Sequence, residues 1–121
     1  SLIKKGDLVL EIHFNAGSPT ATGIETLIDD TPTKEEVYWG NRISVAVQRV
    51  TKEKLRGSNG VKKESESQHK RLAIISDVEP ALNLLLEVGF ITNENLIKSY
   101  RDGYKKLVEE LAKEIRDYCL S

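Results

Sequence analysis

The chain has 121 residues, of which 39% are hydrophobic and 31% are charged, and this composition suits one globular domain over residues 1–121 with a modest core. Its formal net charge of -1 predicts no general attraction to nucleic acid or to an anionic membrane surface. The single cysteine, Cys119, excludes a disulfide framework, and no apolar run is long enough for a membrane span.

Two strands and one helix are predicted in the first half of the chain. Residues 7–13 hold a nearly continuous apolar run that predicts a buried strand, and residues 23–28 predict a second strand after a loop rich in Gly, Ser, Pro and Thr. Thr33 and Glu36 match a capping box, which predicts that a helix starts there. Helical spacing predicts that the buried stripe of this helix consists of Val37, Gly40, Ile43, Val47 and Val50.

The second half is predicted to contain a long polar loop, two short strands and a helix. Residues 52–71 carry few apolar side chains and a local excess of lysine and arginine, which could face an anionic polymer or simply solvent. Short strands are predicted at residues 72–75 and 82–87. Apolar residues recur every three or four positions from Ile97 to Tyr118 and predict a helix.

The ends and continuity of this last helix can also be predicted. Asn93 or Asn95 is a suitable N-cap, and the pair Asp102-Gly103 predicts a break after a short first turn. Strands that alternate with helices predict an α/β fold, with an open mixed or parallel sheet and flanking helices.

Two polar residues occupy positions where polar groups are costly. Glu87 lies among apolar neighbours, where an ionised carboxylate needs a partner, a metal or exposure at a strand end. His13 ends the first strand, and ligands of open α/β sheets gather at the carboxyl ends of strands. From the residues alone, Glu87 could equally face solvent, and His13 is better interpreted as a partly buried side chain bonded to a backbone carbonyl. We expect Glu11 to point to the opposite face of the sheet from His13.

Several common catalytic motifs are absent from the sequence. It contains no HExxH, no CxxC, no phosphate-binding loop and no GxSxG. The second histidine, His69, falls in the polar loop, and its separation from His13 does not match a zinc-ligand spacing. A zinc hydrolase that uses these two histidines together is therefore the weakest hypothesis.

Four segments, in order, resemble the zinc-dependent N-acetylmuramoyl-L-alanine amidases of the amidase-3 family, which occur among bacterial cell-wall hydrolases and phage endolysins. Residues 7–16 end in the sequence His-Phe-Asn-Ala, like the family's apolar strand ending in His-x-Asn-Ala. Residues 23–28 resemble its Gly-x-Glu strand, and residues 69–75 resemble the segment before its last strand. Residues 84–93 resemble its apolar-Glu-x-Gly-Phe-x-x-Asn motif. The first and fourth segments together are the most specific.

The resemblance implies a function and assigns residues to it. His13 would be a zinc ligand, Glu87 the catalytic residue, and Asn15 a residue that touches substrate. The implied cofactor is Zn²⁺, and the implied substrate is peptidoglycan, cleaved at the amide between N-acetylmuramic acid and the L-alanine of the stem peptide. Such an enzyme would act on the bacterial cell wall, either secreted or released from the host cytoplasm as a phage lysin.

The sequence also departs from the family pattern. The family begins with a strand that carries a Gly-His zinc ligand and a helix that carries a glutamate ligand, and neither is present. We therefore expect only His13 of three protein ligands, an inactive isolated chain, and a partial amidase domain that belongs to a longer protein. A second polypeptide that supplies the missing part, or a site that has decayed, would be alternatives. In another functional class, the chain would be a non-catalytic wall-binding or assembly module with the same fold.

Overall fold

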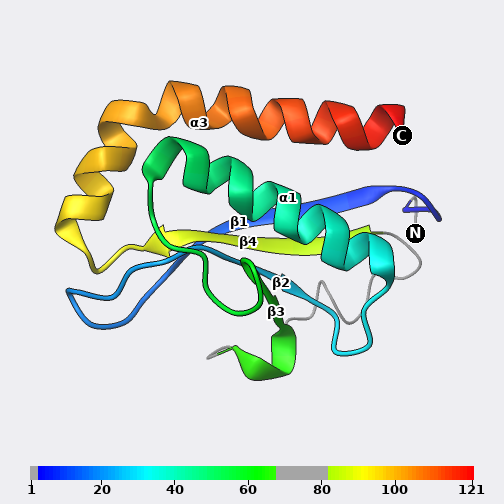
Figure 1. Cartoon of the computed structure of the whole chain (residues 1–121), viewed down its shortest axis with the longest axis horizontal. Coiled ribbons are helices and arrows are strands. Elements are labelled where there is room, and N and C mark those ends of the chain that lie inside the picture. The colour runs from blue at the N-terminus through cyan, green and yellow to red at the C-terminus, as the bar shows by residue number, and fades with distance from the viewer. Residues whose placement is uncertain (1–2, 68–81) are drawn as a thin grey trace.

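The computed structural model describes residues 3–67 and 82–121, which form a mixed α/β fold (Figure 1). The α/β class with an open mixed sheet is confirmed, whereas the strand predicted at residues 72–75 lies outside the described residues. In chain order, the elements are β1 (Leu8–Asn15), β2 (Glu25–Ile28), α1 (Lys34–Thr51), β3 (Val61–Lys63), the short 3-10 helix η1 (Glu64–Glu66), β4 (Leu82–Phe90) and α3 (Glu94–Leu120).

The described strands form one sheet in the order β1-β4-β2-β3. β1 runs parallel to β4, β2 runs antiparallel to β4, and β3 runs parallel to β2. The carboxyl ends of β1 and β4 therefore lie at the same edge of the sheet as the amino end of β2. We call this edge the carboxyl edge. Among the described strands, β1 is an outer strand with a single neighbour.

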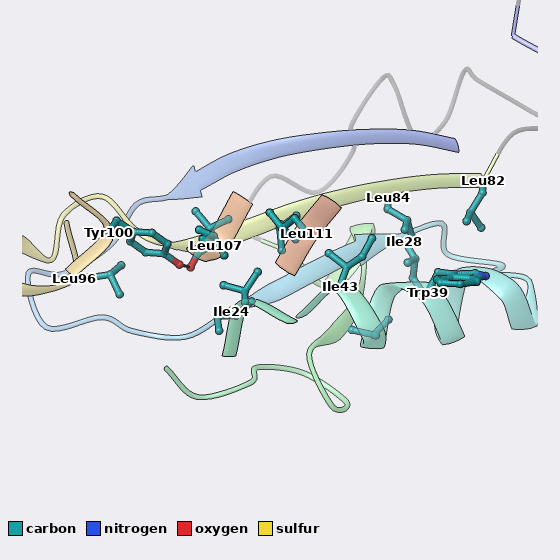
Figure 2. Packing of buried hydrophobic residues seen from close by; sticks show 14 residues of the cluster. Ile24, Ile28, Trp39, Ile43, Leu82, Leu84, Leu96, Tyr100, Leu107 and Leu111 are labelled. Carbon is teal, nitrogen blue, oxygen red and sulfur yellow. Dashed lines mark hydrogen bonds between the residues drawn. The ribbon is translucent and has the colours of Figure 1, made fainter. Parts of the chain in front are cut away.

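Both long helices pack on one face of the sheet, antiparallel to each other (Figure 1). Alternate side chains of β4 point to that face because the side-chain period of a strand is two residues. They meet apolar residues of both helices in a single core (Figure 2), whose members include Ile24, Ile28, Trp39, Ile43, Leu84, Leu86, Leu96, Leu107 and Leu111. Each large aliphatic side chain buried in this way stabilises the fold by roughly 1.5–3 kcal/mol.

An ion-pair network fastens α1 to α3. Arg42 donates from Nε to Glu114 Oε2 over 2.8 Å and from Nη2 to Asp117 Oδ2 over 3.0 Å, and its guanidinium lies 5.0 Å from the centre of the Trp39 ring. The hydrogen bond to Glu114, and then one to Tyr38, raise the pKa of Arg42 above its ordinary value. Glu114 is only 5% exposed, so its charge needs this partner.

The predicted start of α1 is confirmed, and its buried stripe is confirmed in part. The Thr33 hydroxyl accepts from the Glu36 amide over 3.1 Å, and Glu36 Oε1 accepts from the Thr33 amide over 3.0 Å. Val37, predicted to be buried, is 44% exposed, and Trp39 is buried instead. Gly40, Ile43 and Val47 are buried as predicted, so the stripe keeps its direction and is wider than the prediction. A Cβ at Gly40 would lie 3.4 Å from Val61 Cγ2, which is an ordinary van der Waals contact, so packing against the sheet does not require glycine there.

Two further predictions from the second half of the chain were wrong. Residues 52–71 were expected to form a polar loop, yet they contain the edge strand β3, whose partner β2 lies far away in sequence. The break expected at Asp102-Gly103 is also wrong, because α3 is one continuous helix from Glu94 to Leu120. Figure 1 shows that α3 bends in its first part instead of breaking. Within the described residues, no helix combines the length and apolarity that crossing a bilayer would require.

Candidate active site

Three polar side chains lie side by side across the sheet, close to its carboxyl edge. Glu87 of β4 is the Cα partner of His13 on β1 and of Glu25 on β2. Directly opposite residues of neighbouring strands point to the same face, so these side chains share the face opposite the helices. Glu87 is 1% exposed and Glu25 2% exposed, whereas the His13 side chain is 48% exposed. The register thus unites the predicted zinc ligand and the predicted catalytic residue.

The residues next to Glu87 in β4 determine the direction of its side chain and the position of its backbone. Its neighbours Leu86 and Val88 point into the core, which leaves the Glu87 side chain on the opposite face. The buried Tyr100 hydroxyl donates to the carbonyl oxygen of Val88. Burial, followed by the negative charge of Glu53, raises the pKa of Tyr100 above its ordinary value, so this hydroxyl keeps its proton and remains a donor. The backbone beside Glu87 is therefore anchored to α3.

The prediction that Glu11 faces away from His13 was wrong. His13 Nε2 lies 3.2 Å from Glu11 Oε1, and both side chains are partly exposed. The physical reason is the two-residue period of a strand, which places residues two apart on the same face. The Glu11 carboxylate can therefore orient the His13 imidazole, as carboxylates beside metal-binding histidines commonly do.

The loop after β1 is fastened to the segment after β4. The Ile91 amide donates to the Asn15 carbonyl over 2.8 Å, and the Gly17 amide donates to Thr92 Oγ1 over 3.2 Å. Asn93 Nδ2 donates to the Ala21 carbonyl over 3.2 Å. Asn15 itself is 4% exposed, at the end of β1 and one two-residue step beyond His13. Residues in and next to the family-like segment 84–93 thus position the loop that follows the family-like segment 7–16.

Glu25 and Arg56 complete the polar group at this edge. Arg56 Nη1 lies 3.2 Å from Glu25 Oε1, and the guanidinium lies 4.9 Å from the centre of the Phe90 ring. The Gly-x-Glu strand in the sequence points to Glu25, but no sequence pattern gives a role to Arg56. Arg56 is one of several cations in a stretch interpreted as a polar loop, and its position depends on the nonlocal bridge that joins Leu55 to Ile24.

The described residues supply at most part of a zinc site. Residues 3–67 and 82–121 contain no cluster of three His, Cys, Asp or Glu side chains that could hold a metal ion. A catalytic zinc usually has three protein ligands, with His nitrogen and carboxylate oxygen among the preferred donors. His13, an accessible imidazole with a carboxylate beside it, suits one of these positions. His69 lies outside the described residues.

Carboxylates and imidazoles are the side chains that most often act in general acid–base catalysis, and these two lie at the carboxyl edge of the sheet, where ligands of open α/β sheets bind. The sequence profile of the N-acetylmuramoyl-L-alanine amidase family (Amidase_3) matches residues 3–117. The chain therefore belongs to the N-acetylmuramoyl-L-alanine amidase family.

Solved structures agree with this assignment. A Neisseria meningitidis protein assigned as an N-acetylmuramoyl-L-alanine amidase is 31% identical, with a TM-score of 0.75 over 90% of this chain and 56% of that one. The catalytic domain of the CD27L endolysin, which targets Clostridia difficile, is 22% identical, with a TM-score of 0.72 over 92% of this chain and 54% of that one, and so supports the fold. This chain thus spans about half the length of these structures. No curated protein matches it.

Proposed function

We propose that the protein carrying this chain is a zinc-dependent peptidoglycan hydrolase that cleaves the amide between N-acetylmuramic acid and the L-alanine of the stem peptide. The observation that carries the proposal is the strand register that pairs His13 with Glu87. Family membership supports the type of bond. The protein would act on the bacterial cell wall, as a secreted enzyme or as a phage lysin released from the host cytoplasm.

Glu87 would be the general base and then the general acid. Its carboxylate would take a proton from the attacking water as the water oxygen bonds to the scissile carbonyl carbon. The same carboxyl would then deliver that proton to the leaving amine nitrogen as the C–N bond breaks. Because Glu87 is 1% exposed, bulk water would have little access to its carboxylate and would compete little for the proton.

His13 would hold zinc through its imidazole, with Glu11 as the carboxylate that orients the ring. When bound, zinc supplies Lewis-acid polarisation of the scissile carbonyl. The remaining ligands would come from outside the described residues, either from another segment of the same protein or from another chain. Asn15, near the end of the same strand, would contact substrate next to the loop 16–22.

Replacement of Glu87 by glutamine in the full-length protein tests the proposal. The amide side chain keeps the shape but cannot take a proton, so we expect hydrolysis to fall by at least about 10²-fold. Release of new L-alanine amino termini from purified peptidoglycan, without new reducing sugars, would identify amidase cleavage. Bound zinc should remain unchanged on elemental analysis. Wild-type protein that binds the wall but releases no amino termini would contradict the proposal and support a non-catalytic wall-binding or assembly module.

A further inference from the structure

The Arg56 side chain is held in one orientation by contacts from two parts of the chain, residues 23–25 and Phe90. Its guanidinium pairs with Glu25 over 3.2 Å and lies over the Phe90 ring at 4.9 Å. Its aliphatic stem crosses Gly23, where a Cβ would lie 2.5 Å from Arg56 Cγ and where φ is +120°. The Arg56 amide also donates to the Ile24 carbonyl over 2.8 Å. An arginine fixed in this way loses little conformational entropy when it binds a further group.

Arg56 lines a polar hollow of about 310 Å³ on the same face of the sheet as Glu87. The other lining residues are Asn15, Glu25, Lys62, Glu66 and Ser67. Lys62 is the Cα partner of Leu27, two residues from Glu25, so it projects from the same face.

Two cations and two carboxylates line the hollow, and of the carboxylates Glu25 is buried whereas Glu66 is exposed. Among the described residues, no carboxylate forms an ion pair with Lys62, and Glu66 Oε1 already accepts from the Lys63 amide over 3.3 Å. Glu25 is 3% exposed at its side chain, whereas that of Arg56 is 32% exposed. The acidic partner is thus buried beneath Arg56, and the guanidinium retains N–H donors on its exposed side, since it has five in a planar fork.

We propose that Arg56, with Lys62 beside it, binds a carboxylate of the stem peptide next to the amide that is cleaved. This inference rests on the proposed function and adds a substrate feature to it. The two groups that Arg56 contacts flank Glu87: Glu25 is its cross-strand partner, and Phe90 follows it three residues later in β4. A carboxylate bound at Arg56 would therefore fix the peptide beside the proposed catalytic group. Planar, two-point binding of a carboxylate is what a guanidinium does best.

Calorimetry on the full-length protein with the Glu87→Gln substitution tests this subsite without cleavage of the ligand. The two probes are N-acetylmuramoyl-L-alanyl-D-glutamate with its γ-carboxylate amidated, so that the α-carboxylate is its one carboxylate, and the same compound with the α-carboxylate also converted to a carboxamide. We expect the carboxylate probe to bind roughly tenfold more tightly, as loss of a charged hydrogen bond predicts. Adding Arg56→Gln should abolish this preference. Equal affinity for both probes before the Arg56 substitution would overturn the proposal.

Three further variants separate binding from stability. Gly23→Ala displaces the Arg56 stem without changing any charge, so it should also reduce the preference. Lys63 is an exposed cation that follows Lys62 in β3 but does not line the hollow. Lys63→Gln should therefore leave the preference intact. Arg56→Gln leaves the buried Glu25 carboxylate without its cationic partner, which could destabilise the fold. The double variant Arg56→Gln/Glu25→Gln removes this unpaired charge. A preference that persists in a folded double variant would also overturn the proposal.

The experiments distinguish a failure of this inference from a failure of the proposed function. If the wild-type protein cleaves peptidoglycan but its Glu87→Gln variant binds both probes equally, only the carboxylate subsite is refuted. If the Glu87→Gln variant prefers the carboxylate probe but the wild-type protein releases no L-alanine amino termini, only the amidase activity is refuted.

Discussion

At the scale of single residues, two glycines lie in opposite environments. Gly89 follows Glu87 by two positions, has a φ of +156°, and would place a Cβ 2.4 Å from Leu96 Cδ2. Gly103 lies inside α3, and apart from its chain neighbours and the adjacent backbone of α3, no atom lies within 4 Å of where its Cβ would be. The first glycine is therefore required by a close contact between β4 and α3, and the second is not required by packing.

We expect Gly89→Ala to lower the free energy of unfolding by about 1–3 kcal/mol, because the added methyl group must displace Leu96 and the backbone is strained. Gly103→Ala should instead raise it by up to about 1 kcal/mol, because alanine favours a helix interior. Urea denaturation of the two variants measures both changes. Equal stability of Gly89→Ala and the unmodified chain would refute the interpretation that the contact between β4 and α3 requires glycine at position 89.

His13 belongs to the same scale. We expect His13→Ala to reduce the zinc content of the full-length protein, because one of the proposed ligands is lost. Glu11→Gln should weaken zinc binding less, by about 10-fold, because it alters only the group that orients the imidazole. Elemental analysis and a chelator competition assay would measure the two effects. Zinc content that does not change in His13→Ala would exclude it as a ligand.

At the scale of elements, Asn93 links helix α3 to the loop after β1 through the oxygen and the nitrogen of its side-chain amide. Its Oδ1 accepts from the Leu96 amide over 3.2 Å and caps α3, and Asn93 is one of the two N-caps that the sequence predicted. Its Nδ2 donates to the Ala21 carbonyl over 3.2 Å and holds the loop after β1, which the sequence did not predict. A cap is a local feature, whereas the Ala21 contact spans 72 positions.

The substitution Asn93→Asp separates these two roles. Aspartate keeps the capping oxygen, so the free energy of unfolding should change by less than about 0.5 kcal/mol. Because aspartate cannot donate to Ala21, amide hydrogen exchange in residues 16–22 should become faster. Asn93→Ala, which loses both contacts, should also cost about 1 kcal/mol of stability. Unchanged exchange in Asn93→Asp would show that the loop is held by other contacts.

At the scale of the whole molecule, the described sheet leaves β1 without a neighbour on one side. Ile12 and Phe14 of this strand are 56% and 42% exposed. An outer strand with exposed apolar side chains tends to pair with another chain. The chain also spans only about half the length of the amidase structures that it resembles.

We expect the 121-residue chain, expressed by itself, to self-associate through β1. Ile12→Lys should reduce this association, because a lysine on an outer strand opposes edge-to-edge pairing. Leu120→Lys is a matched control, since Leu120 is 78% exposed but lies at the end of α3. Sedimentation velocity of the three proteins measures the effect. Equal association of all three would rule out the β1 edge as the contact.

The sequence alone determined the features that depend on near neighbours. The capping box at Thr33, an N-cap at Asn93 or Asn95 and the apolar period of α3 could all be predicted, because each follows from residues a few positions apart. The resemblance of residues 7–16 and 84–93 to one family also identified His13 and Glu87 as candidate site residues. Their roles in zinc binding and catalysis remain predictions.

Only the tertiary structure decided the contacts that depend on strand pairing and register. It placed His13, Glu87 and Glu25 in one row, put β3 beside β2, and brought Arg56 across Gly23 onto Phe90. No short-range pattern encodes these contacts, because each depends on the pairing of segments that are distant in the chain. The physical reason is that sequence periodicity fixes which face a side chain occupies, whereas only strand pairing fixes which residues meet on that face.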